Sequence, residues 1–208
     1  NYGFWFELPE RPTGLHMSLQ TFPRDEPLGE FRDNVSHSNG VYGLRIFPYF
    51  RPNLTQGDTA SSPLSQTAVF ENQTSYANGE KGLMCEQVGD VEFRGFKTAQ
   101  NRFANMDVSI PALFTRSVNL EGRSDYITMP RIVNAVSVGY TANPGITTST
   151  KWLVAVPRKD NFLLEDIRFY QEKPECPTED CAAIKTCSRC EISEASTDSG
   201  ARTAFTNY

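Results

Sequence analysis

The sequence has no excess of basic residues and no long apolar run. The first absence argues against nucleic-acid binding and the second against a membrane-spanning segment. It contains 20 lysines and arginines against 25 aspartates and glutamates, a net charge of −5, and no basic stripe of the kind that binds nucleic acid. No segment approaches the roughly 18 consecutive apolar residues that cross a bilayer. We therefore expect no nucleic-acid partner, and membrane attachment only through an anchor outside these residues.

Groups that carry catalysis or hold cofactors are also scarce. Only two histidines are present, His16 and His37, and no glycine-rich phosphate loop, nucleophile elbow or helix of metal ligands is found. We therefore expect no cofactor and no metal site. The chain starts at Asn1 without an initiator methionine or a signal-like apolar segment. We expect it to be a piece of a longer protein, with its targeting signal and anchor elsewhere.

A long helical stripe is also missing, because 13 prolines and 14 glycines are scattered along the chain and interrupt any apolar pattern with a period of 3.6 residues. What the sequence does contain is an internal repeat. Residues 31–46 match residues 70–85 without a gap, at an offset of 39 residues. The identical positions are Phe31 and Phe70, Ser36 and Ser75, Asn39-Gly40 and Asn78-Gly79, and Gly43-Leu44 and Gly82-Leu83.

A third, more degraded copy follows at residues 93–101, 23 residues after the second. Each copy is typical of a strand, a turn and a second strand, and the Asn-Gly pairs are expected to supply positive φ at a sharp corner. Further strand-like segments are predicted at Ala112–Val118, Arg131–Val138, Lys151–Val156, Phe162–Phe169 and Thr203–Thr206. Coils of about twenty residues built in this way indicate an all-β fold, a parallel β-helix. The alternative is a β-sandwich with a coincidental repeat.

The repeat predicts which residues stack. Phe31, Phe70 and Phe93 are expected in one inward column, and Asn39, Asn78 and Asn101 near one corner, where asparagines can hydrogen-bond in a ladder. We assign residues 1–171 to the β-helix, with an insertion loop near residues 48–66, because a loop of that length is uncommon unless it is functional or glycosylated.

Residues 172–200 differ in composition, because they are acidic and hold four of the five cysteines: Cys176, Cys181, Cys187 and Cys190. A zinc site is the alternative, but the central spacing is tight and no histidine is near, so we expect two disulfides of undetermined pairing in a cysteine-rich loop. Residues 201–208 are expected to begin a following strand. Cys85 takes the place of Ile46 in the repeat and is expected to be a buried thiol, with a bond to a cysteine outside this chain as the second interpretation.

Three acceptor sequons begin at Asn34, Asn53 and Asn72. Each pattern is short and common by itself. Together with the clustered cysteines they favour a secreted or lumenal compartment. We therefore expect glycans on Asn53 and on at least one of Asn34 and Asn72.

Two stretches carry a more specific resemblance, GFWFELPERPTG and PLGEFRDNVSHSNGVYGLRIFPYFRP. They resemble the β-helix region of the fibrocystin and fibrocystin-L family, which is related to transmembrane and secreted hyaluronan-degrading proteins. The family pattern falls on Phe31, Asp33, His37-Ser38, Gly43-Leu44 and Ile46, with Asp33 in place of an asparagine. The resemblance covers roughly residues 3–190. It implies a right-handed parallel β-helix in a large extracellular, glycosylated and often membrane-anchored protein.

A β-helix can be an enzyme, and acid–base chemistry on a glycan needs at least two converging groups. Asp33, His37, Arg45 and Tyr76 could form such a polar ridge, whereas His37 and Tyr76 could instead be a corner stack that fixes the register. We favour the second interpretation, because no further acid–base pair is visible. The expected function is a structural segment of a cell-surface or ciliary coat, with other extracellular domains or chains, and glycans, as partners. The alternative is a hyaluronan-type polysaccharide-cleaving enzyme.

Overall fold

A computed structural model describes residues 1–17, 21–50, 52, 67–109, 130–139, 150, 152–157, 162–170, 182–187 and 203–206. The described part is nearly all parallel β-structure, and its only helix is the short 3₁₀ helix η1, Gly14–His16. The predicted all-β fold is therefore confirmed.

The strands form two sheets, and every pair of neighbouring strands in the described residues is parallel. The first sheet contains β1 (Tyr2–Glu7), β4 (Tyr42–Phe50), β7 (Lys81–Val88), β10 (Ala104–Asp107), β12 (Trp152–Pro157) and β14 (Ala182–Cys187), in that order. The second sheet contains β2 (Phe31–Arg32), β3 (Val35–His37), β5 (Ala68–Glu71), β6 (Thr74–Tyr76), β8 (Val91–Arg94), β9 (Lys97–Ala99), β11 (Arg131–Val138), β13 (Phe162–Tyr170) and β15 (Thr203–Thr206).

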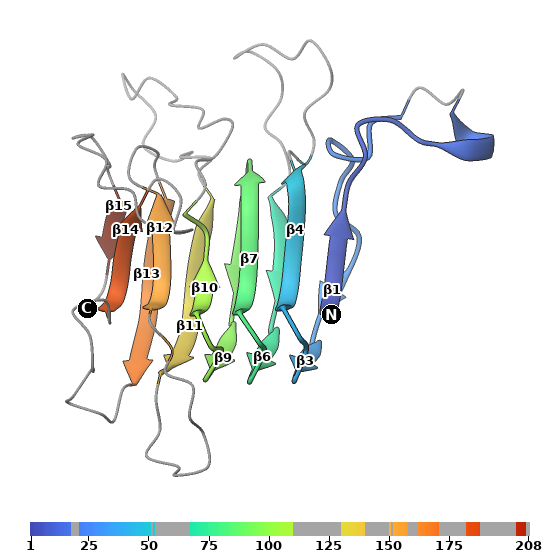
Figure 1. Ribbon diagram of the computed structural model, residues 1–208. Coiled ribbons are helices and arrows are strands. Elements are labelled where there is room, and N and C mark those ends of the chain that lie inside the picture. Colours follow the sequence, from blue (N-terminus) through green and yellow to red (C-terminus); the bar gives the residue numbers. More distant parts are fainter. Residues whose placement is uncertain are drawn as a thin grey trace, which may run out of the picture.

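The chain alternates between the two sheets, and one passage through the second sheet and then the first is called a coil below. Coil 1 consists of β2, β3 and β4, coil 2 of β5, β6 and β7, and coil 3 of β8, β9 and β10. Coil 4 consists of β11 and β12, and coil 5 of β13 and β14. Figure 1 shows the coils side by side along one axis, with β4 and β7 running opposite to β11 and β13.

An apolar column fills the space between the sheets. Phe31 pairs with Phe70 and Phe70 with Phe93, at ring-centroid distances of 5.1 and 5.6 Å, which confirms the predicted phenylalanine column. Ile132 and Leu164 continue the column in coils 4 and 5. From the first sheet, the side chains that complete the core include Leu44, Leu83, Met106 and Val154.

The position of the positive-φ residues differs from the prediction. Neither Asn39-Gly40 nor Asn78-Gly79 has positive φ. Instead, in coils 1 to 3, one positive-φ residue lies between the two short strands of the second sheet (Asp33, Asn72 and Gly95) and another follows the second of these strands (Ser38, Ala77 and Gln100). In coils 4 and 5 the positions equivalent to Gly95 are Asn134 and Asp166, which lie within the single strands β11 and β13.

Most of the later predicted strands are also present. β11, β12, β13 and β15 confirm four of the predicted segments to within one residue at each end, and Ala112–Val118 lies outside the described residues. β4 continues through Pro48 to Phe50, because Phe50 is buried and packs against Phe6 and Phe70. The first residues of the predicted 48–66 loop are therefore strand.

Part of the predicted cysteine-rich segment is a strand as well. β14, Ala182–Cys187, pairs with β12 in the first sheet, and Ile184 packs against the core. Cys176, Cys181 and Cys190 lie outside the described residues, as does the side chain of Cys187, so the disulfides stay a prediction.

Candidate functional site

A ladder of asparagine side chains lies at one corner of the stack. Asn39 donates from its backbone N and from Nδ2 to Oδ1 of Asn78, at 3.2 and 2.9 Å. Asn78 makes the same two bonds to Oδ1 of Asn101, at 3.1 and 2.8 Å. The predicted corner ladder is therefore confirmed.

The ladder continues one step further than the repeat predicted. Asn101 donates from its backbone N and Nδ2 to Oδ1 of Asn105, at 3.2 and 3.0 Å. Asn105 then donates to the Ser137 hydroxyl and the Val138 carbonyl of coil 4. An asparagine side chain suits this role because it carries one acceptor oxygen and two donor hydrogens. Each such bond contributes roughly 0.5–1.5 kcal/mol net.

A glycine beside the ladder allows the two sheets to approach closely. A Cβ at Gly43 would lie 2.0 Å from Oγ of Ser75 and 2.6 Å from the carbonyl oxygen of Gly82. Ser36 donates to Oγ of Ser75 at 3.1 Å, and Ser75 donates to the Gly82 carbonyl at 2.9 Å. Any side chain at Gly43 would therefore displace these serines.

His37 and Tyr76 form an exposed stack on the outside of the second sheet. They lie opposite each other on β3 and β6, with ring centroids 4.9 Å apart and planes inclined by 12°. His37 contacts the Ser38 hydroxyl through Nδ1 at 3.2 Å, and within the described residues no carboxylate pairs with its ring. The two rings therefore stack as predicted, although within β3 and β6 and not at a corner. Their role in fixing the register stays a prediction.

Asp33 and Arg45 lie apart from that stack in the fold. Asp33 turns the corner before β3, and its Oδ1 accepts from Nδ2 of Asn72 at 3.1 Å. Arg45 is on β4 in the first sheet and forms an ion pair with Glu86 at 2.8 Å. The four residues of the alternative active site are therefore divided between two sheets, and the structure does not bring Arg45 to the others.

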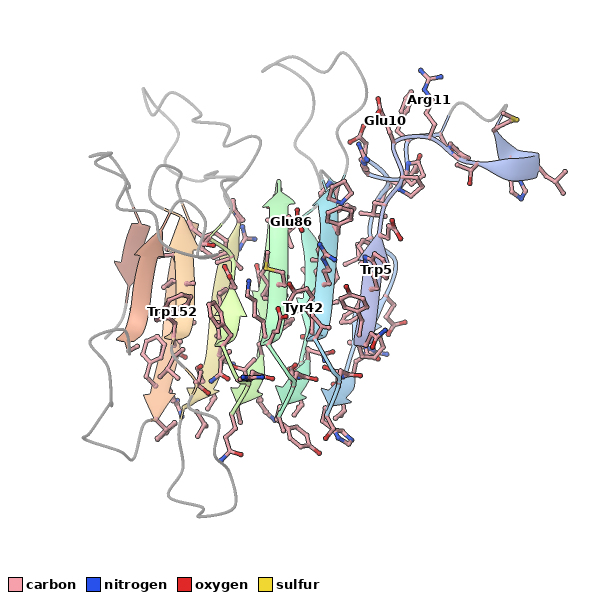
Figure 2. The ribbon with its side chains drawn as sticks, in the orientation of Figure 1. Trp5, Glu10, Arg11, Tyr42, Glu86 and Trp152 are labelled. Atoms are coloured by element: carbon pink, nitrogen blue, oxygen red, sulfur yellow. The ribbon has the colours of Figure 1, made fainter. Side chains whose placement is uncertain are left out.

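The surroundings of Arg45 are aromatic. Its guanidinium carbon lies 4.4 Å from the ring centroid of Phe47, and it is within 5.8 Å of the rings of Tyr2, Trp5 and Tyr42. Burial by itself would lower the pKa of Arg45, but the hydrogen bond and charge of Glu86, together with the charges of Tyr2 and Tyr42, raise it above the ordinary value. Figure 2 shows Trp5, Tyr42 and Glu86 on the neighbouring strands β1, β4 and β7. Cation–π contacts and one ion pair thus fix this side chain in place.

A pair of carboxylates that the sequence analysis did not single out lies on the second sheet. Arg131 binds Glu92 at 2.7 Å and approaches Asp90 at 3.6 Å, and Glu92 also pairs with Arg94. The pair could have been found from Asp90 and Glu92, which are two residues apart, because alternate residues of a strand share a face. Arginines already neutralise both acids, so the cluster joins coils 3 and 4 and offers no free acid–base pair.

Cys85 is a buried, free thiol opposite Ile46, as predicted. Burial, with smaller effects from Asp107 and Glu86, raises its pKa well above the ordinary value. Within the described residues no group of three or more histidines, cysteines or carboxylates is placed to hold a metal ion. No helix there is long and apolar enough to cross a membrane.

Two of the three predicted glycosylation sites can be placed. Asn34 is half-buried directly before β3, and Asn72 is exposed at the corner before β6. Asn53 lies outside the described residues. Glycosylation at all three positions stays a prediction.

The fold and the ladder define a repeat-built, parallel all-β protein. Over 107 residues the chain is 31% identical to Fibrocystin-L of Mus musculus and 30% identical to Fibrocystin-L of Homo sapiens. The chain is related to the fibrocystin family, as its coil 1 motif predicted. The alignments cover 51% of this chain but only 2% of each relative. No protein-family model and no solved structure matches.

Proposed function

We propose that the chain is a segment of a right-handed parallel β-helix with a structural role in a large extracellular cell-surface or ciliary glycoprotein. Connections between parallel strands of one sheet are right-handed in nearly all proteins, which supports the handedness. The small share of each relative that the alignment covers supports a place within a very long chain. The three sequons support a glycosylated, extracellular location.

The observation that carries this proposal is the unbroken contact from coil to coil. The apolar column and the amide ladder join consecutive coils through directly stacked side chains, and Asn105 extends the ladder to coil 4. Repeat proteins of this kind gain stability from each interface between neighbours. A segment built in this way would serve as a stiff rod.

Partners follow from the same proposal. The rod would carry other extracellular domains or chains of a surface assembly, with membrane attachment through an anchor elsewhere in the protein. Trp5 is 47% exposed beside Tyr2, and exposed aromatic rings of this type can contact glycans. The four cysteines between Cys176 and Cys190 would form two disulfides in the oxidising extracellular space.

The structure offers less support for the alternative, a hyaluronan-type polysaccharide-cleaving enzyme. Cleavage needs an acid and a base at one sugar bond, and Arg45 is on a different sheet from His37 and Tyr76. The acids of the Asp90–Glu92 cluster are already paired with arginine. A net charge of −5 would also repel an anionic polysaccharide.

One assay separates the rod from the enzyme. The 208-residue protein, secreted and folded, is incubated with hyaluronan, and chain length is followed by size-exclusion chromatography with His37→Ala as a matched control. We expect no shortening. Cleavage by the unsubstituted protein that is lost in His37→Ala would overturn the structural proposal, and the longest available form of the protein should be assayed in parallel.

The location is tested separately by peptide mapping with and without glycosidase. We expect a glycan on Asn53 and on at least one of Asn34 and Asn72. Unmodified asparagines at all three positions, in protein from a secreting cell, would contradict the extracellular assignment.

A further inference from the structure

The two sheets end at different strands on the N-terminal side of the stack. The first sheet ends at β1, whereas the second sheet ends at β2 and β3. We propose that the outer edge of β2 and β3 is a docking surface for one further parallel coil, with an asparagine in register with Asn39. That the coil comes from polypeptide outside residues 1–208 rests on the proposed function. The residues that the coil must carry follow from the contacts of β1, Asn39 and Phe31.

β1 already follows the pattern of the coils. Tyr2-Gly3-Phe4 pairs in register with Tyr42-Gly43-Leu44 of β4. A Cβ at Gly3 would lie 2.6 Å from Cβ of Ser36, which is the type of close approach seen at Gly43. β1 is therefore the first-sheet half of a coil, and the second-sheet half of that coil would lie against β2 and β3.

The asparagine ladder has a direction, and its first member lacks a donor. Asn39 and Asn78 each give their backbone N–H and Nδ2 to Oδ1 of the asparagine in the next coil, and Asn101 gives the same two groups to Oδ1 of Asn105 within coil 3. No described residue donates to Oδ1 of Asn39, whereas Oδ1 of Asn78, Asn101 and Asn105 each accept two bonds. The group that would complete the ladder is a backbone N–H and an amide from a preceding coil.

The apolar column is incomplete at the same end. Phe31 is only partly buried, although Phe70 and Phe93 are 0% exposed. A strand laid against β2 with an apolar residue in register would cover Phe31, as Phe31 covers Phe70. Figure 1 shows the segment that holds η1 projecting beyond β1 on this side, and there Leu15 and Met17 are 98% and 73% exposed. A further coil would give these side chains a surface to contact.

The register allows the docking coil to be built from the protein's own sequence. Val41 donates to the carbonyl of Asn1, and Glu80 donates to the carbonyl of Val41, each at 2.8 Å. Asn1, Val41 and Glu80 therefore occupy equivalent positions in successive coils, each directly before the first-sheet strand of its coil. A copy of residues 68–79, fused directly before Asn1, would place its two short strands beside β2 and β3 and its asparagine above Asn39.

Hydrogen exchange of the extended protein tests the proposal, with amides of β6 and β9 reporting that the common fold is intact. We expect exchange at the amides of Val35–His37 that face the new strands to slow at least about tenfold, because edge amides become paired. The protection should fall when the asparagine of the extension is replaced by alanine. It should be lost when one glycine is inserted before Asn1, because this shifts the register by one residue.

Three results would overturn the proposal. Unchanged exchange in the extended protein, with β6 and β9 protected, would mean that the edge takes no coil. Equal protection by all three extensions would mean that the ladder does not select the register. Concentration-dependent protection of β3 in the unextended protein would identify a second copy as the occupant. The hyaluronan assay does not depend on any of these results, so failure of the docking surface and failure of the structural function are distinguishable.

Discussion

The apolar column and the asparagine ladder share coils 1 to 3 but differ in what happens beyond them. Along the column, phenylalanine in coils 1 to 3 gives way to isoleucine and leucine in coils 4 and 5. The asparagines of the ladder lie in coils 1 to 3, and in coil 4 the bonds end on the Ser137 hydroxyl and the Val138 carbonyl. The column therefore continues through a change of side chain, whereas the ladder ends where asparagine is replaced.

The physical reason for this difference is that hydrogen bonds depend on direction, whereas apolar burial does not. Apolar burial depends on area and packing and has no preferred bond direction, so different apolar residues can fill one column. A hydrogen bond weakens steeply when its distance or angle changes, so only one side-chain length fits between stacked backbones. The corner therefore fixes the register of the coils, and the column supplies most of the stability.

The largest effect is expected in the middle of the column. Phe70→Ala removes a fully buried ring that contacts Phe31, Phe93, Phe6 and Phe50. It should lower the free energy of unfolding by about 3–5 kcal/mol, measured by urea denaturation. Phe31→Ala at the end of the column is the control and should cost less than half of that. Equal losses at both positions would contradict a column with an open end.

The second-largest effect is expected in the asparagine ladder, where Asn101→Ala should lower the free energy of unfolding by about 2–3 kcal/mol. Asn101→Ala removes the acceptor of the Asn78 backbone N–H and Nδ2 and the side-chain donor to Oδ1 of Asn105, and each unpaired buried group costs roughly 1–3 kcal/mol. Asn39→Ala, at the partly buried end, should cost about 1 kcal/mol. The same urea measurement checks both, and a cost at Asn39 as large as that at Asn101 would be inconsistent with a directional ladder.

Conservative substitutions should sharpen the difference. Phe70→Leu should cost less than about 1.5 kcal/mol, because apolar replacements of similar volume are tolerated. Asn78→Gln keeps the amide but lengthens the side chain, and it should cost about 2 kcal/mol, nearly as much as Asn78→Ala. If Asn78→Gln costs no more free energy of unfolding than Phe70→Leu, the ladder is no more demanding of side-chain length than the column is of side-chain shape.

The smallest change in stability is expected at a corner of the chain, where a substitution should stabilise the protein. Ala77 has a φ of 51°, a conformation that costs a non-glycine residue roughly 1–2 kcal/mol. Ala77→Gly should therefore stabilise the protein by about 0.5 kcal/mol after the entropy of the unfolded chain is subtracted. Ala99→Gly, in strand β9 without positive φ, should destabilise it by about 0.5–1 kcal/mol. Thermal unfolding of the two variants compares them directly.

Contacts between equivalent residues were predictable because the offset of 39 residues aligns them. Phe31 with Phe70, Asn39 with Asn78, and Cys85 in place of Ile46 follow from that alignment alone. β1 was missed as a partial copy, because Tyr2-Gly3-Phe4 is too short to stand out before the pairing with β4 is seen.

Two errors have clear physical causes. Positive φ was predicted at the Asn-Gly pairs, but Gly79 is there for close approach, since a Cβ would lie 2.1 Å from the Gly40 carbonyl oxygen. The corners after the second short strand use Ser38, Ala77 and Gln100, which no composition rule selects. Arg45 was grouped with His37 because both lie in one coil, but the sequence does not show that the chain passes to the other sheet between them.

The most direct test of the stacked register is a cross-link between coils 1 and 2. His37 and Tyr76 are Cα partners on adjacent parallel strands, which lie roughly 4.8 Å apart and so within reach of a disulfide. The protein with His37→Cys and Tyr76→Cys should form that disulfide under mild oxidation, identified by peptide mass spectrometry. The matched pair Val35→Cys and Tyr76→Cys is two residues out of register, roughly 8 Å between Cα atoms, and should not. Formation of the 35–76 link in preference to the 37–76 link would contradict the register on which the column and the ladder both depend.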